Sequence, residues 1–307
     1  MKRSARAADV CAFEAGNQRK EQVAAASIKV GRLAYRCRLA RASLILCAVQ
    51  PLSGILAAVA ASCLLLLLAL PVGALIGGSG ARGLSLLFTD RELRNALLLT
   101  IGTATSATML AAVGGTPLAW LMARRSFRGR ALLAALLDLP LVLPHPVAGI
   151  ALLLVFGRNS PVGQVFLQAG LRIVGTPLGI IAAMLFVSAP LFVSAARESI
   201  GQVPLQLENA ARTLGDSPWQ TWWRVTLPLS ARGLLAAGVI TWARAVSEFG
   251  AIVVLAYNPK VASVLSYERF TSYGLPEALP VAAALALLSL VPLIALRALR
   301  SHSTPVT

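Results

Sequence analysis

The residues with the clearest chemical potential are charged and polar side chains inside long apolar runs. Arg244, Ser247 and Glu248 fall within one such run, and Arg244 and Glu248 are four residues apart. A charged side chain near the centre of a bilayer costs about 2.5–3.5 kcal/mol on insertion scales, so each needs a partner or a water-filled cavity. On a helix, this spacing places both side chains on one face. The pattern predicts either a structural ion pair or part of a transport pathway and its gate.

A second unusual feature is a histidine flanked by two prolines. His145 lies between Pro144 and Pro146 inside another apolar run. Each proline lacks a backbone N–H and its ring disturbs a helix. Broken helices within a membrane are tolerated only where they line a cavity or pack on protein, so these residues are candidates for a pathway wall or gate. A histidine held in the interior by a hydrogen bond is the alternative.

Catalytic and cofactor-binding patterns are missing from the sequence. There is no GxxxxGK[ST], HExxH or GxSxG motif, so no nucleotide-binding loop, zinc-protease helix or hydrolase nucleophile is predicted. The four cysteines form no CxxC pair, and we expect unpaired thiols and no metal site. We therefore predict no catalytic residue and no cofactor on this chain. A membrane-embedded enzyme stays an alternative that would need a buried pair of catalytic side chains.

The composition identifies the setting of these residues. Of 307 residues, 57% are hydrophobic and 13% are charged, and the mean hydropathy is +0.75. Soluble domains carry about 25% charged residues, so an ordinary soluble protein is excluded. The net charge of +16 would suit a nucleic-acid partner, but aromatic residues are only 6% and no nucleic-acid-binding motif is present. We predict no nucleic-acid partner, because basic loops beside apolar segments indicate the cytoplasmic side of a membrane.

Six apolar segments, each of about 20 residues or more, are long enough for a helix to cross a bilayer. We therefore predict an all-α polytopic protein of the plasma (inner) membrane, embedded in the lipid bilayer by six transmembrane helices. The predicted spans cover residues 52–76, 95–123, 131–156, 177–196, 233–257 and 278–299.

The charges between the spans give the orientation and the domain boundaries. Twenty Lys and Arg residues fall on one side of the predicted membrane and seven on the other. The richer side is expected in the cytoplasm, so both termini are placed there. We expect a poorly ordered basic tail at 1–43, a transmembrane domain at 44–300 and a short cytoplasmic tail at 301–307.

The cytoplasmic loop at 199–230 carries signals for two short helices. Pro204 suits a first helical turn, and Gly215 suits a left-handed cap at the end of that helix. Ser217 is expected to cap the next helix, and Leu227 with Pro228 to end it. Three tryptophans at i, i+3 and i+4, namely Trp219, Trp222 and Trp223, form one aromatic ridge. The ridge indicates either a protein-docking surface or a membrane-interface anchor.

This loop resembles the EAA loop of ABC importer permeases, whose pattern is E-A-A-x3-G-x9-I-x-L-P. Asn209 stands where the pattern has its glutamate, and Glu208 stands one place earlier. Residues 139–157 and 242–251 are similar to permeases of the molybdate, tungstate and sulfate group. The coupling-loop residues that the resemblance implies are Glu208, Asn209, Ala210, Ala211, Gly215, Trp219, Val225, Leu227 and Pro228.

The resemblance also implies a fold, partners and a substrate. The fold is that of a type I ABC importer permease, expected to work as a homodimer. Two cytoplasmic ABC ATPase subunits would bind ATP and Mg and drive the spans through the loop, and an extracytoplasmic binding protein would deliver the substrate. That substrate is a tetrahedral oxyanion, molybdate or tungstate. A sulfate or thiosulfate permease of the same family and a self-contained secondary transporter are the alternatives.

Overall fold

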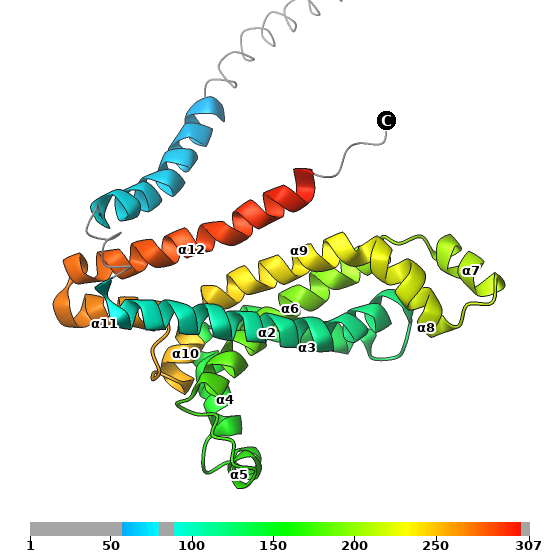
Figure 1. The fold of residues 1–307 in the computed structure, drawn as a ribbon, viewed down its shortest axis with the longest axis horizontal. Helices are drawn as coiled ribbons and strands as arrows, with labels where there is room; N and C mark the ends of the chain where they lie inside the picture. The colour runs from blue at the N-terminus through cyan, green and yellow to red at the C-terminus, as the bar shows by residue number, and fades with distance from the viewer. Residues whose placement is uncertain (1–56, 80–88, 302–307) are drawn as a thin grey trace, which may run out of the picture. The chain divides into compact units, whose positions relative to one another are not determined.

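The computed structural model describes residues 57–79 and 89–301 (Figure 1). The chain divides into two units, Met1–Pro71 and Val72–Thr307, and every regular element among the described residues is helical. The predicted tail at 1–43, most of the segment at 301–307, and Cys11, Cys37 and Cys47 lie outside the described residues. The first predicted span corresponds to the helix Ala57–Ser79.

Three long helices of the unit Val72–Thr307 confirm predicted spans. They are α2 (Arg91–Arg124), α6 (Pro177–Gly201) and α12 (Leu275–Ser301). α2 packs along α6, and α6 packs along α9 (Leu227–Val246). Small residues permit this close approach: a Cβ atom added to Gly115 would lie 2.8 Å from Cδ1 of Phe192.

The predicted third span, at 131–156, is not one helix. It is divided into α3 (Arg130–Val142) and α4 (His145–Phe156), whose axes are bent by 115°. Leu143 is extended because it precedes Pro144, and Pro146 occupies the first turn of α4, where its missing N–H costs nothing. Five long helices with this bent pair give up to six candidate spans, in agreement with the predicted number.

The predicted bounds of the fifth span, 233–257, differ at both ends from those of the helix in the structure. The helix begins earlier, because α8 (Pro218–Thr221) continues through a π-helical turn (Trp222–Thr226) into α9. Leu227 and Pro228 therefore do not end a helix: the widened turn already interrupts the ordinary hydrogen-bond ladder just before the proline. α9 then ends at Val246, and a separate helix α10 (Gly250–Leu255) follows.

The two ends of the long helices carry different short elements. α7 (Leu205–Thr213) and α8 lie at the end of the bundle where α2 finishes, and α11 (Ala262–Tyr273) lies at the opposite end, where α2 begins (Figure 1). α5 (Pro161–Gln168) follows α4. With the predicted orientation, α7 and α8 face the cytoplasm and α11 faces outward.

Candidate functional site

The two helix breaks meet, and this contact forms the polar site inside the bundle. α4 packs against α10, and glycines permit the approach. A Cβ atom on Gly250 would lie 2.6 Å from Cβ of His145, and one on Gly149 would lie 2.8 Å from the carbonyl oxygen of Ala251. Pro144 and Pro146 contribute by ending α3 and starting α4 in the direction of this contact.

Glu248 is the buried centre of the site. Its side chain is 1% exposed, and Oε1 accepts a hydrogen bond of 2.9 Å from the backbone N–H of Ala251 in α10. Oε2 lies 3.0 Å from an Nη2 atom of Arg244, one turn back on α9. Among the described residues, Oε2 accepts no hydrogen bond of normal geometry. The 3.0 Å contact between Arg244 and Glu248 is the ion pair that their spacing predicts.

Arg244 also contacts two further predicted residues. Its Nη2 atom lies 3.0 Å from Nε2 of His145, and Nη1 donates to the hydroxyl of Ser247 over 3.3 Å. The His145 side chain is 46% exposed and that of Arg244 is 22% exposed, whereas Glu248 is hidden behind them. The accessible side of the site therefore presents hydrogen-bond donors and a guanidinium rather than a carboxylate. Such a surface suits an anion.

The loop at 199–230 has the caps that its sequence predicts. Gly215 has a φ of +99°, and the backbone N–H of Asp216 bonds to the carbonyl of Ala211, which closes the end of α7. Ser217 caps α8 in a reciprocal capping box with Gln220, and Pro218 follows at the first helical position. Pro204 directly precedes α7.

Two tryptophans of the ridge are exposed and one is half-buried. Trp219 and Trp223 are 68% and 52% exposed and pack edge to face, with ring centroids 5.6 Å apart. Trp222 is half-buried and packs edge to face against Trp120 of α2, with ring centroids 6.4 Å apart. Leu214 is 89% exposed at the tip of the loop. The loop thus presents a small apolar surface, and one of its contacts with α2 is this aromatic pair.

Of the coupling-loop residues, Glu208 is buried, and the others are exposed or half-buried. Asn209, Ala210, Gly215 and Pro228 are exposed, and Ala211, Val225 and Leu227 are half-buried. Glu208 is 4% exposed and forms an ion pair with Arg124 at 2.7 Å. Sequence reasoning missed Arg124, which lies 84 positions away at the end of α2, because no local spacing links the two residues.

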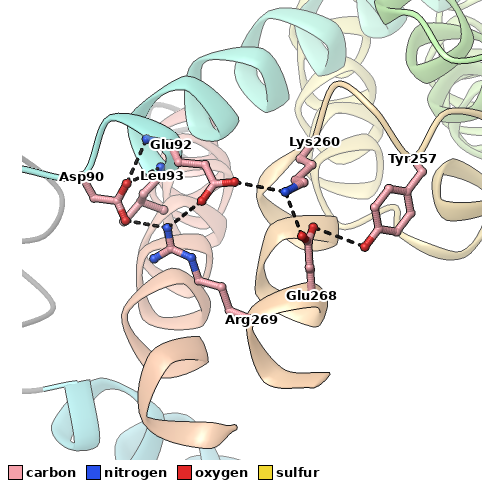
Figure 2. A network of polar contacts seen from close by, with 7 residues as sticks. All are labelled: Asp90, Glu92, Leu93, Tyr257, Lys260, Glu268 and Arg269. Carbon is pink, nitrogen blue, oxygen red and sulfur yellow. Dashed lines mark hydrogen bonds and ion pairs between the residues drawn. The ribbon is translucent and has the colours of Figure 1, made fainter. Parts of the chain in front are cut away.

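A second ionic network, also missed from the sequence, joins α2 to α11 at the opposite end of the bundle (Figure 2). Arg269 donates to Asp90 at 2.6 Å and to Glu92 at 3.1 Å. Lys260 donates to Glu92 and to Glu268, which also accepts from the hydroxyl of Tyr257. These residues come from segments more than 160 positions apart, so only the fold brings them together.

The network shifts the pKa values of its members. Burial acts to raise the pKa of Asp90, but the hydrogen bond from Arg269 and those from its own helix outweigh it and lower the pKa. The hydrogen bond to Glu268 raises the pKa of Lys260, although burial opposes it. Burial, followed by the nearby Glu268 carboxylate, raises the pKa of Tyr257. The charged forms of Asp90 and Lys260 are therefore stabilised in the fold.

A polar cleft of about 560 Å³ lies between α2, α3 and α6, near the end that carries α7. Arg130 and Asp138 of α3 and Arg197 and Glu198 of α6 line it. Asp138, which the sequence places inside a predicted span, therefore borders a cleft rather than the packed core. Among the described residues, no three His, Cys, Asp or Glu side chains are grouped as metal ligands would be.

Solved structures show the fold to which this arrangement of long helices and a broken span belongs. The chain aligns with a bacterial alginate importer with a TM-score of 0.62 at 18% identity, covering 81% of this chain and 96% of that one. It aligns with the methionine transporter MetNI with a TM-score of 0.54 at 17% identity, covering 69% of this chain and 96% of that one. At these identities the likeness shows the fold.

The comparison of sequences identifies a specific family within this fold. Residues 115–305 match the family described as "binding-protein-dependent transport system inner membrane component", and the chain belongs to this family. The chain is thus a permease subunit of an ABC importer and a multi-pass inner-membrane protein, as predicted.

Named relatives agree with the resemblance to oxyanion permeases. The molybdate/tungstate permease WtpB of Thermococcus kodakarensis is 40% identical over 210 residues, 68% of this chain and 78% of that protein. A probable molybdenum permease of Haloferax volcanii is 38% identical, over 72% of this chain and 81% of that protein. The sulfate permease CysT of Synechocystis is 33% identical, over 77% of this chain and 85% of that protein.

Proposed function

We propose that this chain is the membrane subunit of an importer for molybdate or tungstate, with sulfate or thiosulfate as the second candidate. The observation that carries the proposal is the similarity to permeases named for molybdate and tungstate at about 40% identity, against 33–35% for named sulfate permeases. Both substrate groups are tetrahedral dianions, so the same donor chemistry would serve either.

The polar site at the helix breaks is the proposed pathway and gate. Arg244, His145 and Ser247 offer a guanidinium, an imidazole and a hydroxyl on the accessible side. Glu248 neutralises Arg244 from behind, so a passing dianion meets a compensated charge and is not trapped. Pro144 and Pro146 hold the break open by preventing a continuous helix. The charged cleft lined by Arg130 and Arg197 is a candidate for the cytoplasmic exit.

Energy is proposed to reach these spans from partner subunits. The sequence contains no P-loop, so ATP and Mg would bind to two separate cytoplasmic ATPase subunits. The exposed apolar surface of Trp219, Trp223 and Leu214 is suited to seat on such a partner. The loop residues assigned to coupling by resemblance would form the rest of that contact.

The remaining assembly is proposed from the family and the charge pattern. Two copies of the chain would form the pore, with both termini in the cytoplasm, and an extracytoplasmic binding protein would deliver the anion. One structural relative was solved with a periplasmic protein bound to alginate pentasaccharide. ATP-state contacts would then favour one gate arrangement over the other by their difference in free energy.

The test is uptake by the purified complex in proteoliposomes that enclose ATP and contain the binding protein outside. Labelled molybdate should accumulate, unlabelled tungstate should compete, and sulfate should compete less. Arg244→Ala should lower uptake of the labelled anion by about tenfold, since one charge-assisted contact is lost. Preferred uptake of sulfate would make the second candidate correct, and unchanged uptake in Arg244→Ala would remove that residue from the pathway.

A further inference from the structure

The cytoplasmic loop is held by a buried carboxylate rather than by apolar packing. Glu208 is the buried residue of α7, while Leu205 and Leu207 on the same helix are 56% and 47% exposed. Apolar burial is the usual way to fix a helix on a protein, and α7 has little of it. The position of α7 therefore depends on what Glu208 contacts.

Three donor atoms lie within 3.0 Å of one carboxylate oxygen of Glu208. Oε1 lies 3.0 Å from Nε and 2.7 Å from Nη2 of Arg124, and it accepts a 2.8 Å hydrogen bond from the hydroxyl of Thr226. The Arg124 side chain is 8% exposed, so this ion pair is little screened by water or salt. Charge-assisted, buried hydrogen bonds of this kind are the strong ones.

The donors come from elements that enter and leave the loop. Arg124 is the last residue of α2, and its Nη2 atom also donates to the carbonyl of Val203, just after α6. Thr226 is the last residue of the π-helical turn that joins α8 to α9. The contacts of Glu208 thus tie α7 to the ends of α2 and α6 and to the start of α9. We name Glu208, Arg124, Thr226 and the carbonyl of Val203 the loop clamp.

We propose that the loop clamp is the joint through which displacement of the cytoplasmic loop moves the membrane helices, with Glu208 and Arg124 as positioning residues. This inference rests on the proposed function, in which the loop seats on an ATPase subunit. A push on α7 and α8 is passed to α2 through Arg124 and to α9 through Thr226. The π-helical turn is where such a push would bend the helix, and Glu208 holds its last residue.

The test measures how many anions are transported per ATP hydrolysed by the complete complex in proteoliposomes. Glu208→Gln keeps the shape of the side chain and removes its charge, and Thr226→Val removes one donor. Thr226→Ser retains the hydroxyl, and Asp216→Asn removes a carboxylate from an exposed ion pair with Arg224 in the same loop, so both are controls.

We expect Glu208→Gln to lower the ratio of anion to ATP by about tenfold, and Thr226→Val by about threefold, while ATP hydrolysis continues. Both controls should stay near the wild type, and the ATPase subunits should co-purify with every variant to about the same extent. Retained subunits with a lowered ratio distinguish a coupling joint from a residue needed only for assembly.

Two results would overturn the inference: an unchanged ratio in Glu208→Gln, or loss of the ATPase subunits from that variant. If Glu208→Gln is not recovered as a folded protein, Thr226→Val decides, and its unchanged ratio would also overturn the inference. Failure of the proposed function would be recognised earlier and differently, as a wild-type complex that shows no ATP-dependent anion uptake.

Discussion

Two buried glutamates of this permease are satisfied in opposite ways. Glu208 in the loop at 199–230 accepts hydrogen bonds from Arg124 and Thr226, and this arginine is itself buried. Glu248 between the spans has one oxygen bound to the backbone of α10 and the other facing Arg244, whose guanidinium is partly exposed and shared with His145. The partners of the first carboxylate are all buried, while the second has a partner that another anion can reach.

The different exposure of the two arginine partners suggests a different role for each glutamate. A carboxylate whose partners are all internal makes a fixed joint, because breaking it leaves an uncompensated buried charge. A carboxylate whose arginine is accessible can release that arginine to a passing dianion and take it back afterwards. The loop clamp therefore suits transmission of force, and the site at the helix breaks suits temporary contact with a substrate.

The largest effect is expected when Glu208 is removed. Glu208→Ala leaves Arg124 buried without its partner, which should cost about 3–5 kcal/mol of stability. Thermal unfolding of the purified chain in detergent measures this loss. Asp216→Ala breaks an ion pair in which Arg224 is 66% exposed, and it should cost at most about 1 kcal/mol. Equal losses in the two variants would contradict a fixed joint at Glu208.

The second largest effect is expected when the contact between α4 and α10 is disturbed. Gly250→Ala puts a Cβ atom against the Cβ atom of His145, and the strain should cost about 1–3 kcal/mol. Gly238→Ala on α9 meets open space and should be neutral or slightly stabilising. Unfolding and anion uptake of both variants should be measured. A Gly250→Ala variant as stable and active as Gly238→Ala would show that this close approach does not shape the site.

A smaller change is expected at Glu248, and it affects transport more than stability. Glu248→Gln leaves the Arg244 charge uncompensated, so the anion should be held longer. The maximal uptake rate and the half-saturating concentration should both fall, the rate by about tenfold. In the double variant Arg244→Ala/Glu248→Ala, stability should recover while uptake stays low. Recovery of uptake as well would mean that the pair is only structural.

The partly buried network that joins α2 to α11 should give the smallest effect. Asp90→Asn keeps an oxygen to cap α2 and loses the ion pair with Arg269, at a cost of about 1 kcal/mol or less at pH 7. The pKa of Asp90 is lowered from 3.8 in the fold, so its contribution is present above about pH 4 and lost as pH falls through the lower, folded value. The stability difference between wild type and variant should therefore shrink toward pH 3.

A control defines this last comparison. Glu277→Gln changes an exposed glutamate in the first turn of α12 and should leave the pH dependence of the unfolding free energy below pH 4 unchanged. An Asp90→Asn difference that persists at pH 3 would contradict a role for the charged form of Asp90.

The fold was predictable where local signals decide it. Apolar length alone located α2, α6 and α12, and Gly215 and Ser217 marked the ends of the loop helices. Local signals failed where two effects compete. Pro228 normally ends a helix, but the π-helical turn before it accommodates the proline and lets the helix continue.

The site was predictable only in part, for a similar reason. The i, i+4 spacing of Arg244 and Glu248 indicated their pairing. His145 lies 99 positions from Arg244, and only the packing of α4 on α10 brings them together. Glu208 sits one place before the glutamate position of the loop pattern, and its burial depends on Arg124 from another helix. Sequence spacing carries no information on such contacts.

The most direct test of the account is a comparison of uptake by this chain alone and by its complex with ATPase subunits in matched proteoliposomes. We predict that the complex accumulates molybdate against its gradient only when ATP is present, and that the chain alone accumulates none. Uphill accumulation by the chain alone would contradict the account, because its energy would then come from within this chain.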